Sequence, residues 1–286
     1  MATLHMRYPG GLSKALTFSY DDGVEQDIRL VDIFDKYGLK GTFNINTGSF
    51  APEGKVYPAG QVHRRMTEKQ TVALFKNSNH EVAVHTLTHP FLEQLPSHMV
   101  VNEVLNDRIN IETLLGAVCR GMAYPFGFTF SPDSQETVDV LKSCDIVYSR
   151  TTTPSLSLNF PTDWLRLKPT CHHNHEKLDE LTDKFLNEKP TRAPYLFYVW
   201  GHSYEFEEKN NWDRIETFCE RVSGKDDVWY ATNIEIFDYA LAYRSLRFSV
   251  KGDRVFNPTC YEIFFFDSRA GKEYSVKPGE TLELQS

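Results

Sequence analysis

The sequence predicts an α/β fold with mainly parallel strands. Short runs rich in apolar and β-branched residues predict strands, and segments with apolar residues at helical spacing predict the helices between them. Seven such strand–helix units follow one another up to about residue 245. Because right-handed crossovers join parallel strands, this alternation is typical of an open doubly wound sheet or of a closed β/α barrel, and the pattern alone leaves both open.

The seven units follow in order along the chain. Predicted strands cover residues 15–18, 41–45, 80–84, 118–124, 145–149, 195–200 and 227–230. Predicted helices cover residues 26–37, 67–76, 97–115, 131–143, 175–188, 211–222 and 232 onward. Capping boxes at 67–70 and 232–235 and a glycine at position 116 mark helix ends. Residues 151–174 form the longest predicted loop, and long loops in compact domains are often functional.

After residue 245 the pattern changes to short alternating runs at residues 246–250, 261–266, 272–276 and 281–284. Turn dipeptides separate these runs, so they predict a small antiparallel β appendage. We therefore expect a main domain at residues 1–245 and a small β-rich extension at residues 246–286. We expect the role of this extension to be structural, with contact to a neighbouring subunit or to a sugar chain as alternatives.

Composition narrows the class of protein. Of the 286 residues, 41% are hydrophobic, which is enough for one large core. A net charge of −8 argues against nucleic acid or an anionic membrane as the main partner, since both reward clustered basic residues. The N-terminus lacks an apolar signal segment, no run approaches the ~20 apolar residues of a membrane helix, and the five cysteines include no C-x-x-C pair. We therefore expect a cytoplasmic protein with free thiols; the sequence does not indicate its oligomeric state.

Two adjacent carboxylates, Asp21 and Asp22, stand where the first predicted strand ends. Burying them at the edge of a core is costly unless a metal or hydrogen bonds compensate the charge. Followed by Gly23, they are also compatible with an ordinary surface turn, because Asp and Gly are common turn formers.

His85 and His89 directly follow the third predicted strand. Histidines four residues apart share one face if the chain turns helically, so both imidazoles reach one metal. With one carboxylate of the aspartate pair they complete a set of two nitrogens and one oxygen, which suits Zn²⁺, Fe²⁺, Co²⁺ or Ni²⁺. Polar groups at residues 124–127 and 201–203 also follow predicted strands, so four loops place functional groups at the carboxyl ends of parallel strands. The sequence therefore predicts one active site on that rim.

These residues resemble the motifs of the NodB-type polysaccharide deacetylases of carbohydrate esterase family four. The family motif T-F-D-D-G corresponds to residues 17–23, with two residues inserted after Phe18, and the motif H-S/T-x-x-H corresponds to residues 85–89. The resemblance spans about residues 10–245 and implies a distorted (β/α)7 barrel. It also implies that Asp21 is the catalytic base and that Asp22, His85 and His89 bind one divalent metal ion. Zinc is the first choice for this ion, with cobalt, nickel, iron or manganese as alternatives.

The third family motif appears at residues 123–127, where Ala123 replaces the arginine that usually braces the base. Arg120 lies nearby, but on a strand it would share its face with Tyr124 rather than with residue 123. By resemblance, Tyr124 and Phe126 belong to the oxyanion and substrate site. A backbone N–H near Phe126 would contact the oxyanion, and Tyr124 is equally suited to be a structural wall of the sugar site.

The fourth motif, usually an Asp-Trp pair, corresponds to Asp163 and Trp164 in the long loop. The same loop ends in the run Cys171–His175, whose three histidines suit a metal site, a substrate clamp or a solvated loop. Since the metal is already supplied elsewhere, we expect His172 and His173 to contact substrate.

The fifth motif ends at His202, which by resemblance is the general acid. The resemblance implies removal of N-acetyl groups, or of O-acetyl groups, from an acetylated sugar or oligosaccharide. In that reaction Asp21 takes a proton from the attacking water and His202 protonates the leaving amine. Two alternatives stay open: a metal-dependent amidohydrolase acting on a small non-sugar amide, and a non-catalytic barrel that binds carbohydrate.

Overall fold

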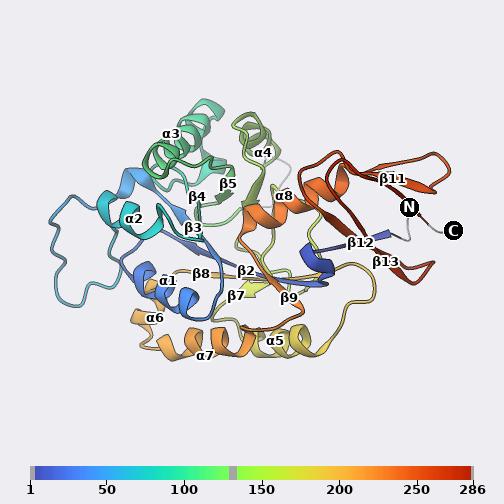
Figure 1. Cartoon of the computed structure of the whole chain (residues 1–286). Coiled ribbons are helices and arrows are strands. Elements are labelled where there is room, and N and C mark those ends of the chain that lie inside the picture. The colour runs from blue at the N-terminus through green and yellow to red at the C-terminus, as the bar shows by residue number, and fades with distance from the viewer. Residues whose placement is uncertain (1–3, 129–133, 285–286) are drawn as a thin grey trace.

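The computed structural model describes residues 4–128 and 134–284, and its centre is a curled parallel sheet (Figure 1). The strands of this sheet are β2 (Lys14–Asp21), β3 (Gly41–Ile45), β4 (Glu81–Val84), β5 (Gly121–Ala123), β6 (Tyr148–Arg150), β7 (Cys171–His172), β8 (Tyr195–Gly201) and β9 (Val228–Tyr230). Their order is β6-β5-β4-β3-β2-β8-β7, and β9 also pairs with β2. All these pairings are parallel. The prediction of a distorted (β/α)7 barrel is confirmed.

Helices fill the connections and cover the sheet on both sides (Figure 1). They are α1 (Gln26–Lys36), α2 (Glu68–Phe75), α3 (Ser97–Leu115), α4 (Ser134–Ser143), α5 (Leu178–Asn187), α6 (Tyr204–Glu208), α7 (Trp212–Val222) and α8 (Asn233–Arg244). Both predicted capping boxes are present, at residues 67–70 and 232–235. Gly116 ends α3 in the left-handed conformation with a φ of 73°. The predicted start of the fourth helix, at residue 131, lies outside the described residues.

Two short elements of the barrel were not predicted, β7 within the long loop and α6 directly after β8. A strand of two residues and a helix of five are too short to show a hydrophobic period. α6 matters for function because it carries Tyr204 and Glu205 next to the end of β8.

Both ends of the chain contribute to two small antiparallel sheets, which have the orders β1-β12-β13 and β10-β11-β14. Their strands are β1 (Leu4–Arg7), β10 (Arg247–Phe248), β11 (Arg254–Phe256), β12 (Ile263–Asp267), β13 (Lys272–Val276) and β14 (Thr281–Glu283). β1 was not predicted, because the strand that pairs with it lies at the other end of the chain. These small sheets lie on one side of the molecule (Figure 1).

Apolar packing joins these parts into one body. β2 is buried along its whole length, and Phe18 packs between Phe34 of α1 and Phe218 of α7. A second cluster contains Tyr239 of α8 together with Phe265 of β12, so the C-terminal strands share a core with the barrel. Among the described residues, no helix combines the length and the apolar character needed to cross a membrane.

The carboxyl ends of the parallel strands bring four loops to one edge of the sheet. Asp21 at the end of β2 is the register partner of Asn44 in β3, and Val84 at the end of β4 is the partner of Met122 in β5. Loops that leave adjacent parallel strands at the same height converge, and functional groups gather there in such folds.

Candidate active site

A cleft of about 570 Å³ opens at this edge of the sheet. It is lined by Asp21, Asp22, His63, Arg65, His85, His89, Tyr124, Phe126, Thr152, Trp200, His202 and Tyr204. The structure thus brings together the residues predicted as base, metal ligands and acid, and both residues of the third motif. His63, Arg65 and Tyr204 were not predicted, because they match no motif.

Asp22, His85 and His89 form a group that could hold a metal ion. The Nε2 atoms of His85 and His89 lie 4.0 and 3.6 Å from Asp22 Oδ1. His85 Nδ1–H donates to the carbonyl oxygen of Ala123 at 2.8 Å, which leaves the lone pair on Nε2, the atom that faces Asp22. Burial is the main cause that lowers the pKa of His85 to about 4, so this ring is neutral, as a metal ligand must be. Two imidazole nitrogens and one carboxylate fit a divalent ion such as Zn²⁺.

The backbone that carries these ligands is strained. Asp22, Thr86 and His89 have positive φ angles of 87°, 66° and 63°, each of which costs about 1–3 kcal/mol in a residue with a side chain. Local hydrogen bonds hold this conformation: Thr86 Oγ1 accepts from the backbone N–H of His89 at 3.1 Å. Asp107 of α3 accepts from the backbone N–H of His85 at 3.0 Å. Such strain, held by the surrounding fold, is common at functional sites.

Asp21 is buried and accepts hydrogen bonds on both carboxylate oxygens. Asn44 Nδ2 donates to Oδ1 at 2.8 Å, and Arg150 Nη2 donates to Oδ2. Arg150 is itself fully buried, with its guanidinium 4.3 Å from the centre of the Trp200 ring. Burial acts to raise the pKa of Asp21, but the positive groups around it, Arg150 first among them, lower the pKa overall. Asp21 is therefore an ionised carboxylate.

Arg150, and not Arg120, braces the predicted base. Arg120 pairs with Asp145 at 2.9 Å, away from the cleft. Arg150 is the register partner of Ala123 on the adjacent strand, so its guanidinium reaches Asp21 from the strand next to the position where the family has its arginine. The sequence contained a signal for this, because Arg150 directly follows the predicted strand 145–149.

Two residues of the loop between β3 and α2 contact Asp22. Arg65 Nη2 lies 3.1 Å from Oδ1, and His63 Nε2 lies 3.3 Å from Oδ2. Burial acts to raise the pKa of Asp22, but the hydrogen bond to His63 and the charge of Arg65 hold it well below its usual range. Asp22 is therefore ionised as well.

His202 lies opposite Asp21 in the cleft. Its Nε2 atom is 3.9 Å from Asp21 Oδ2, and its Nδ1 atom is 2.9 Å from Glu205 Oε1. Burial acts to lower the pKa of His202, but the hydrogen bond to Glu205 and the charges of Asp21 and Asp22 raise it overall. The imidazole therefore holds its proton to a higher pH than a free histidine does.

Glu205 also contacts two histidines that do not line the cleft. Its Oε2 atom lies 3.4 Å from His172 Nε2 and 3.2 Å from His173 Nε2. The three side chains have the spacing of a metal site. However, His172 Nδ1 accepts from the backbone N–H of Asn174 at 3.1 Å, so in the neutral ring Nε2 carries the hydrogen and offers Glu205 a proton rather than a lone pair. His172 and His173, which we expected to contact substrate, contact Glu205 and do not line this cleft.

The third-motif residues occupy different positions in the cleft. Tyr124 is buried, and its hydroxyl donates to the carbonyl oxygen of Leu165 at 2.7 Å, so it is a wall of the site. Phe126 has a φ of 59° and is 57% exposed. Its ring stacks on Phe91 with 3.9 Å between the ring centres and lies 4.4 Å from the ring of His89.

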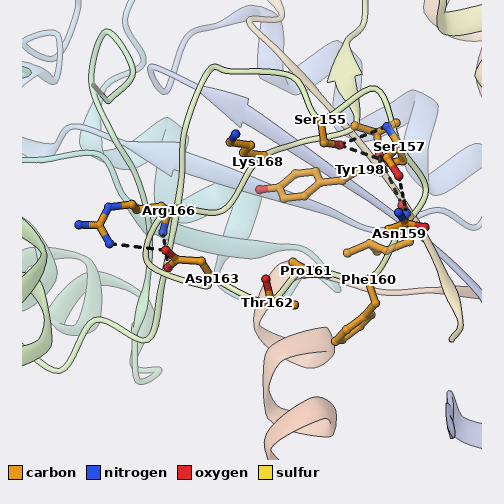
Figure 2. A pocket seen from close by; sticks show the side chains of 12 residues that line it. Ser155, Ser157, Asn159, Phe160, Pro161, Thr162, Asp163, Arg166, Lys168 and Tyr198 are labelled. Atoms are coloured by element: carbon orange, nitrogen blue, oxygen red, sulfur yellow. Dashed lines mark hydrogen bonds and ion pairs between the residues drawn. The ribbon is translucent and has the colours of Figure 1, made fainter. Parts of the chain in front are cut away.

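Asp163 and Trp164 do not line the cleft. Asp163 lines a second pocket of about 460 Å³ under the long loop, where it pairs with Arg166 (Figure 2). Trp164 is buried in the core, with its ring 5.1 Å from that of Phe237. The loop that carries the expected fourth motif therefore packs against the barrel and supplies no carboxylate to the cleft.

Residues 8–149, about half of the chain, match the family model for polysaccharide deacetylases. No curated protein sequence matches the chain. Among solved structures, a putative polysaccharide deacetylase from Mycobacterium smegmatis is similar over 84% of this chain and 94% of that chain, with 15% identity and a TM-score of 0.55. At that identity the likeness shows the fold.

Two further solved structures show weaker likeness. A Streptococcus pyogenes deacetylase in complex with acetate has 22% identity over 48% of this chain and a TM-score of 0.40, and the match spans only 55% of that protein. A carbohydrate esterase family four pseudoenzyme from Bacillus anthracis has 18% identity over 82% of this chain and 68% of that chain, with a TM-score of 0.46. From the barrel, the two motifs at its rim and the match over residues 8–149, we conclude that this chain belongs to the polysaccharide deacetylase family and is of the NodB type.

Proposed function

We propose that this protein is a metal-dependent hydrolase that removes acetyl groups from an acetylated sugar or oligosaccharide. One observation carries the proposal: a carboxylate base and an imidazole acid share one cleft with a two-histidine, one-carboxylate group. His202 Nε2 and Asp21 Oδ2 are 3.9 Å apart, and both residues line the cleft with Asp22, His85 and His89. Metal-assisted hydrolysis of an acetamide uses these three parts together.

Asp22, His85 and His89 would hold one divalent ion, and their nitrogen and oxygen donors favour zinc over magnesium or calcium. When bound, such an ion polarises the acetyl carbonyl group and stabilises the charge that develops on its oxygen. Cobalt, nickel, iron and manganese are alternative ions for the same donor set.

Asp21 accepts the proton of the attacking water. Arg150 and Asn44 each use one of its oxygens, and an ionised carboxylate offers about four acceptor positions, so Asp21 keeps a free lone pair for this task. Arg150 also keeps the carboxylate ionised at the pH of the reaction. The oxygen of the water then bonds to the acyl carbon.

His202 donates a proton to the leaving nitrogen as its bond to the acyl carbon breaks. Glu205 holds Nδ1 at 2.9 Å, which turns Nε2 toward Asp21 and the cleft. Because the pKa of His202 is raised, the ring is protonated at the pH where Asp21 is ionised. The products are a free amine on the substrate and acetate.

Phe91 and Phe126 support a carbohydrate as substrate. They are 50% and 57% exposed, and they stack on each other beside His89. Exposed aromatic faces next to a polar cleft suit the apolar face of a sugar ring better than a small aliphatic amide.

The test is acetate release from a panel of N-acetylated oligosaccharides, peptidoglycan fragments, O-acetylated oligosaccharides and small amides. We expect release from an acetylated sugar, loss of activity with chelator, and recovery with zinc. Release from small amides alone would favour an amidohydrolase. Sugar binding without any acetate release would favour a non-catalytic barrel.

A further inference from the structure

We infer that Arg65 is a positioning residue of the cation site, which fixes Asp22 relative to the loop that carries His85 and His89. This inference rests on the proposed metal-dependent function. It goes beyond that function by giving a role to a residue outside every motif of the sequence.

One guanidinium group holds both the side chain and the main chain of Asp22. Arg65 Nη2 lies 3.1 Å from the carboxylate oxygen Oδ1, and Arg65 Nη1 donates to the backbone carbonyl of the same residue. Asp22 has a positive φ of 87°, a conformation that relaxes unless neighbouring groups hold it. A two-point contact from a rigid planar group fixes the direction of the carboxylate.

The same guanidinium is linked to the loop after β4. Arg65 Nη1 donates to Asn46 Oδ1 at 2.9 Å, and Asn46 Nδ2 donates to the backbone carbonyls of His85 and, at 2.9 Å, of Thr86. Asn46 is 1% exposed, so these bonds do not compete with solvent. A continuous set of hydrogen bonds therefore runs from Asp22 through Arg65 and Asn46 to the backbone of His85.

The backbone at Arg65 is fixed by the segment that follows Asp22. Arg65 forms an isolated antiparallel bridge with Val24, and the flanking bonds join Met66 N to Gly23 O at 3.0 Å and Glu25 N to Arg64 O at 2.7 Å. The side chain of Arg65 thus begins at a defined point next to its target. Its contact with Asp22 is built into the fold and is not a chance meeting of two exposed side chains.

The contact leaves Asp22 free to bind an ion. A carboxylate oxygen has two lone pairs, so Oδ1 can accept from Arg65 and still face the Nε2 atoms of His85 and His89, at 4.0 and 3.6 Å. Metal-binding carboxylates are usually hydrogen-bonded in this way, and loss of such a partner typically weakens metal binding about 10–100-fold. If the charge of Arg65 mainly repelled the ion, removal of Arg65 would instead strengthen metal binding.

The experiment measures the affinity of the full-length, metal-free protein for Zn²⁺ by competition with a chromophoric chelator. Arg65→Met should weaken binding by about 10–100-fold. Arg64→Met is the matched control, because Arg64 carries the same charge one residue away but pairs with Glu25 and Glu207 at 2.8 and 2.7 Å. We expect the control to retain wild-type affinity.

Two further measurements separate positioning from charge and from folding. Arg65→Lys keeps the charge but cannot make the two-point contact, so its affinity should stay reduced. The visible spectrum of bound Co²⁺ reports ligand geometry, so it should change in both Arg65 variants and not in Arg64→Met. The melting temperatures of the metal-free proteins show whether each variant is folded.

Unchanged or tighter zinc binding in Arg65→Met, or full affinity in Arg65→Lys, would overturn the positioning role while leaving the proposed metal site intact. If the wild-type protein itself binds no zinc, the proposed metal dependence fails, and the positioning role fails with it.

Discussion

Replacing Arg150 with methionine should destabilise the protein strongly, because Asp21 would lose its main counter-charge inside the barrel. The side chains of Arg150 and Asp21 are 0% and 3% exposed. Removing one partner of a buried ion pair costs about 3–5 kcal/mol. At about 2–4 °C per kcal/mol for a protein of this size class, the melting temperature should fall by roughly 6–20 °C.

The double variant separates lost pairing from lost packing. Arg150→Met and Asp21→Asn each leave one buried charge without a partner, whereas the double variant leaves none. The double variant should therefore be more stable than the sum of the two single losses predicts, by up to about 3 kcal/mol.

The pH dependence of the Arg150→Met variant has a defined sign. Arg150 lowers the pKa of Asp21 below its value in the unfolded chain, so the pair stabilises the fold above that unfolded value and loses this effect as the pH falls through the folded pKa. In Arg150→Met, burial dominates and raises the pKa of Asp21. The acidic limb of kcat/KM should therefore move to higher pH.

Urea and thermal unfolding of the wild type, the two single variants and the double variant provide the assay. Arg120→Met is the control, because the Arg120–Asp145 pair is 31% and 59% exposed and such pairs contribute about 0–1 kcal/mol. If Arg150→Met loses no more stability than Arg120→Met, the buried pair does not stabilise the fold. The same conclusion follows if the losses in the free energy of unfolding of Arg150→Met and Asp21→Asn simply add in the double variant.

Four further outcomes follow from the site. A His85→Gln variant should lose most of its bound metal in elemental analysis after gel filtration, while Cys171→Ala should keep it; stoichiometric metal in His85→Gln would disprove the assignment. Asp21→Asn should keep metal but lose about 10²–10⁴ in kcat, so near-normal turnover would exclude Asp21 as base. His202→Ala should lower kcat much more on an acetamido sugar than on an activated ester, and equal losses on both would show that His202 does not donate the proton. Glu205→Gln should move the alkaline limb of kcat/KM to lower pH, because Glu205 raises the pKa of His202; an unmoved limb would contradict this coupling.

The sequence predicted the fold and several of the residues that line the cleft, because both depend on local patterns. Asp21 and His85 stand directly after apolar runs that could be recognised as strands, and parallel strands bring such positions to one edge of a sheet. The capping box at residues 67–70 is local in the same sense, and it is present in the structure. Elements too short to repeat a hydrophobic period, such as α6, left no comparable signal.

The charged partners of Asp21 and His202 could not be predicted in the same way, because one depends on a contact between distant parts of the chain and the other on a short helix. The arginine beside the predicted base is Arg150 on β6, whereas the family motif has its arginine on the adjacent strand, at the position of Ala123. The partner of the predicted acid His202 is Glu205, which lies on α6, an element too short to be predicted. In both cases a charge lies beside a predicted residue, on an element that the motifs did not indicate.

The positions of Arg150 and Glu205 share a physical cause. A buried aspartate needs a counter-charge and an acid histidine needs an acceptor for Nδ1–H, but neither need specifies which strand or helix provides the partner. Here a guanidinium reaches Asp21 from β6, on the residue that is the register partner of Ala123. Glu205 follows His202 by three residues, and its backbone N–H donates to the carbonyl oxygen of His202 at 3.2 Å, so the pair is set by local geometry once α6 forms. A motif search by position therefore fails at these partners, while a search for the nearest unexplained charge that follows a predicted strand would have found Arg150.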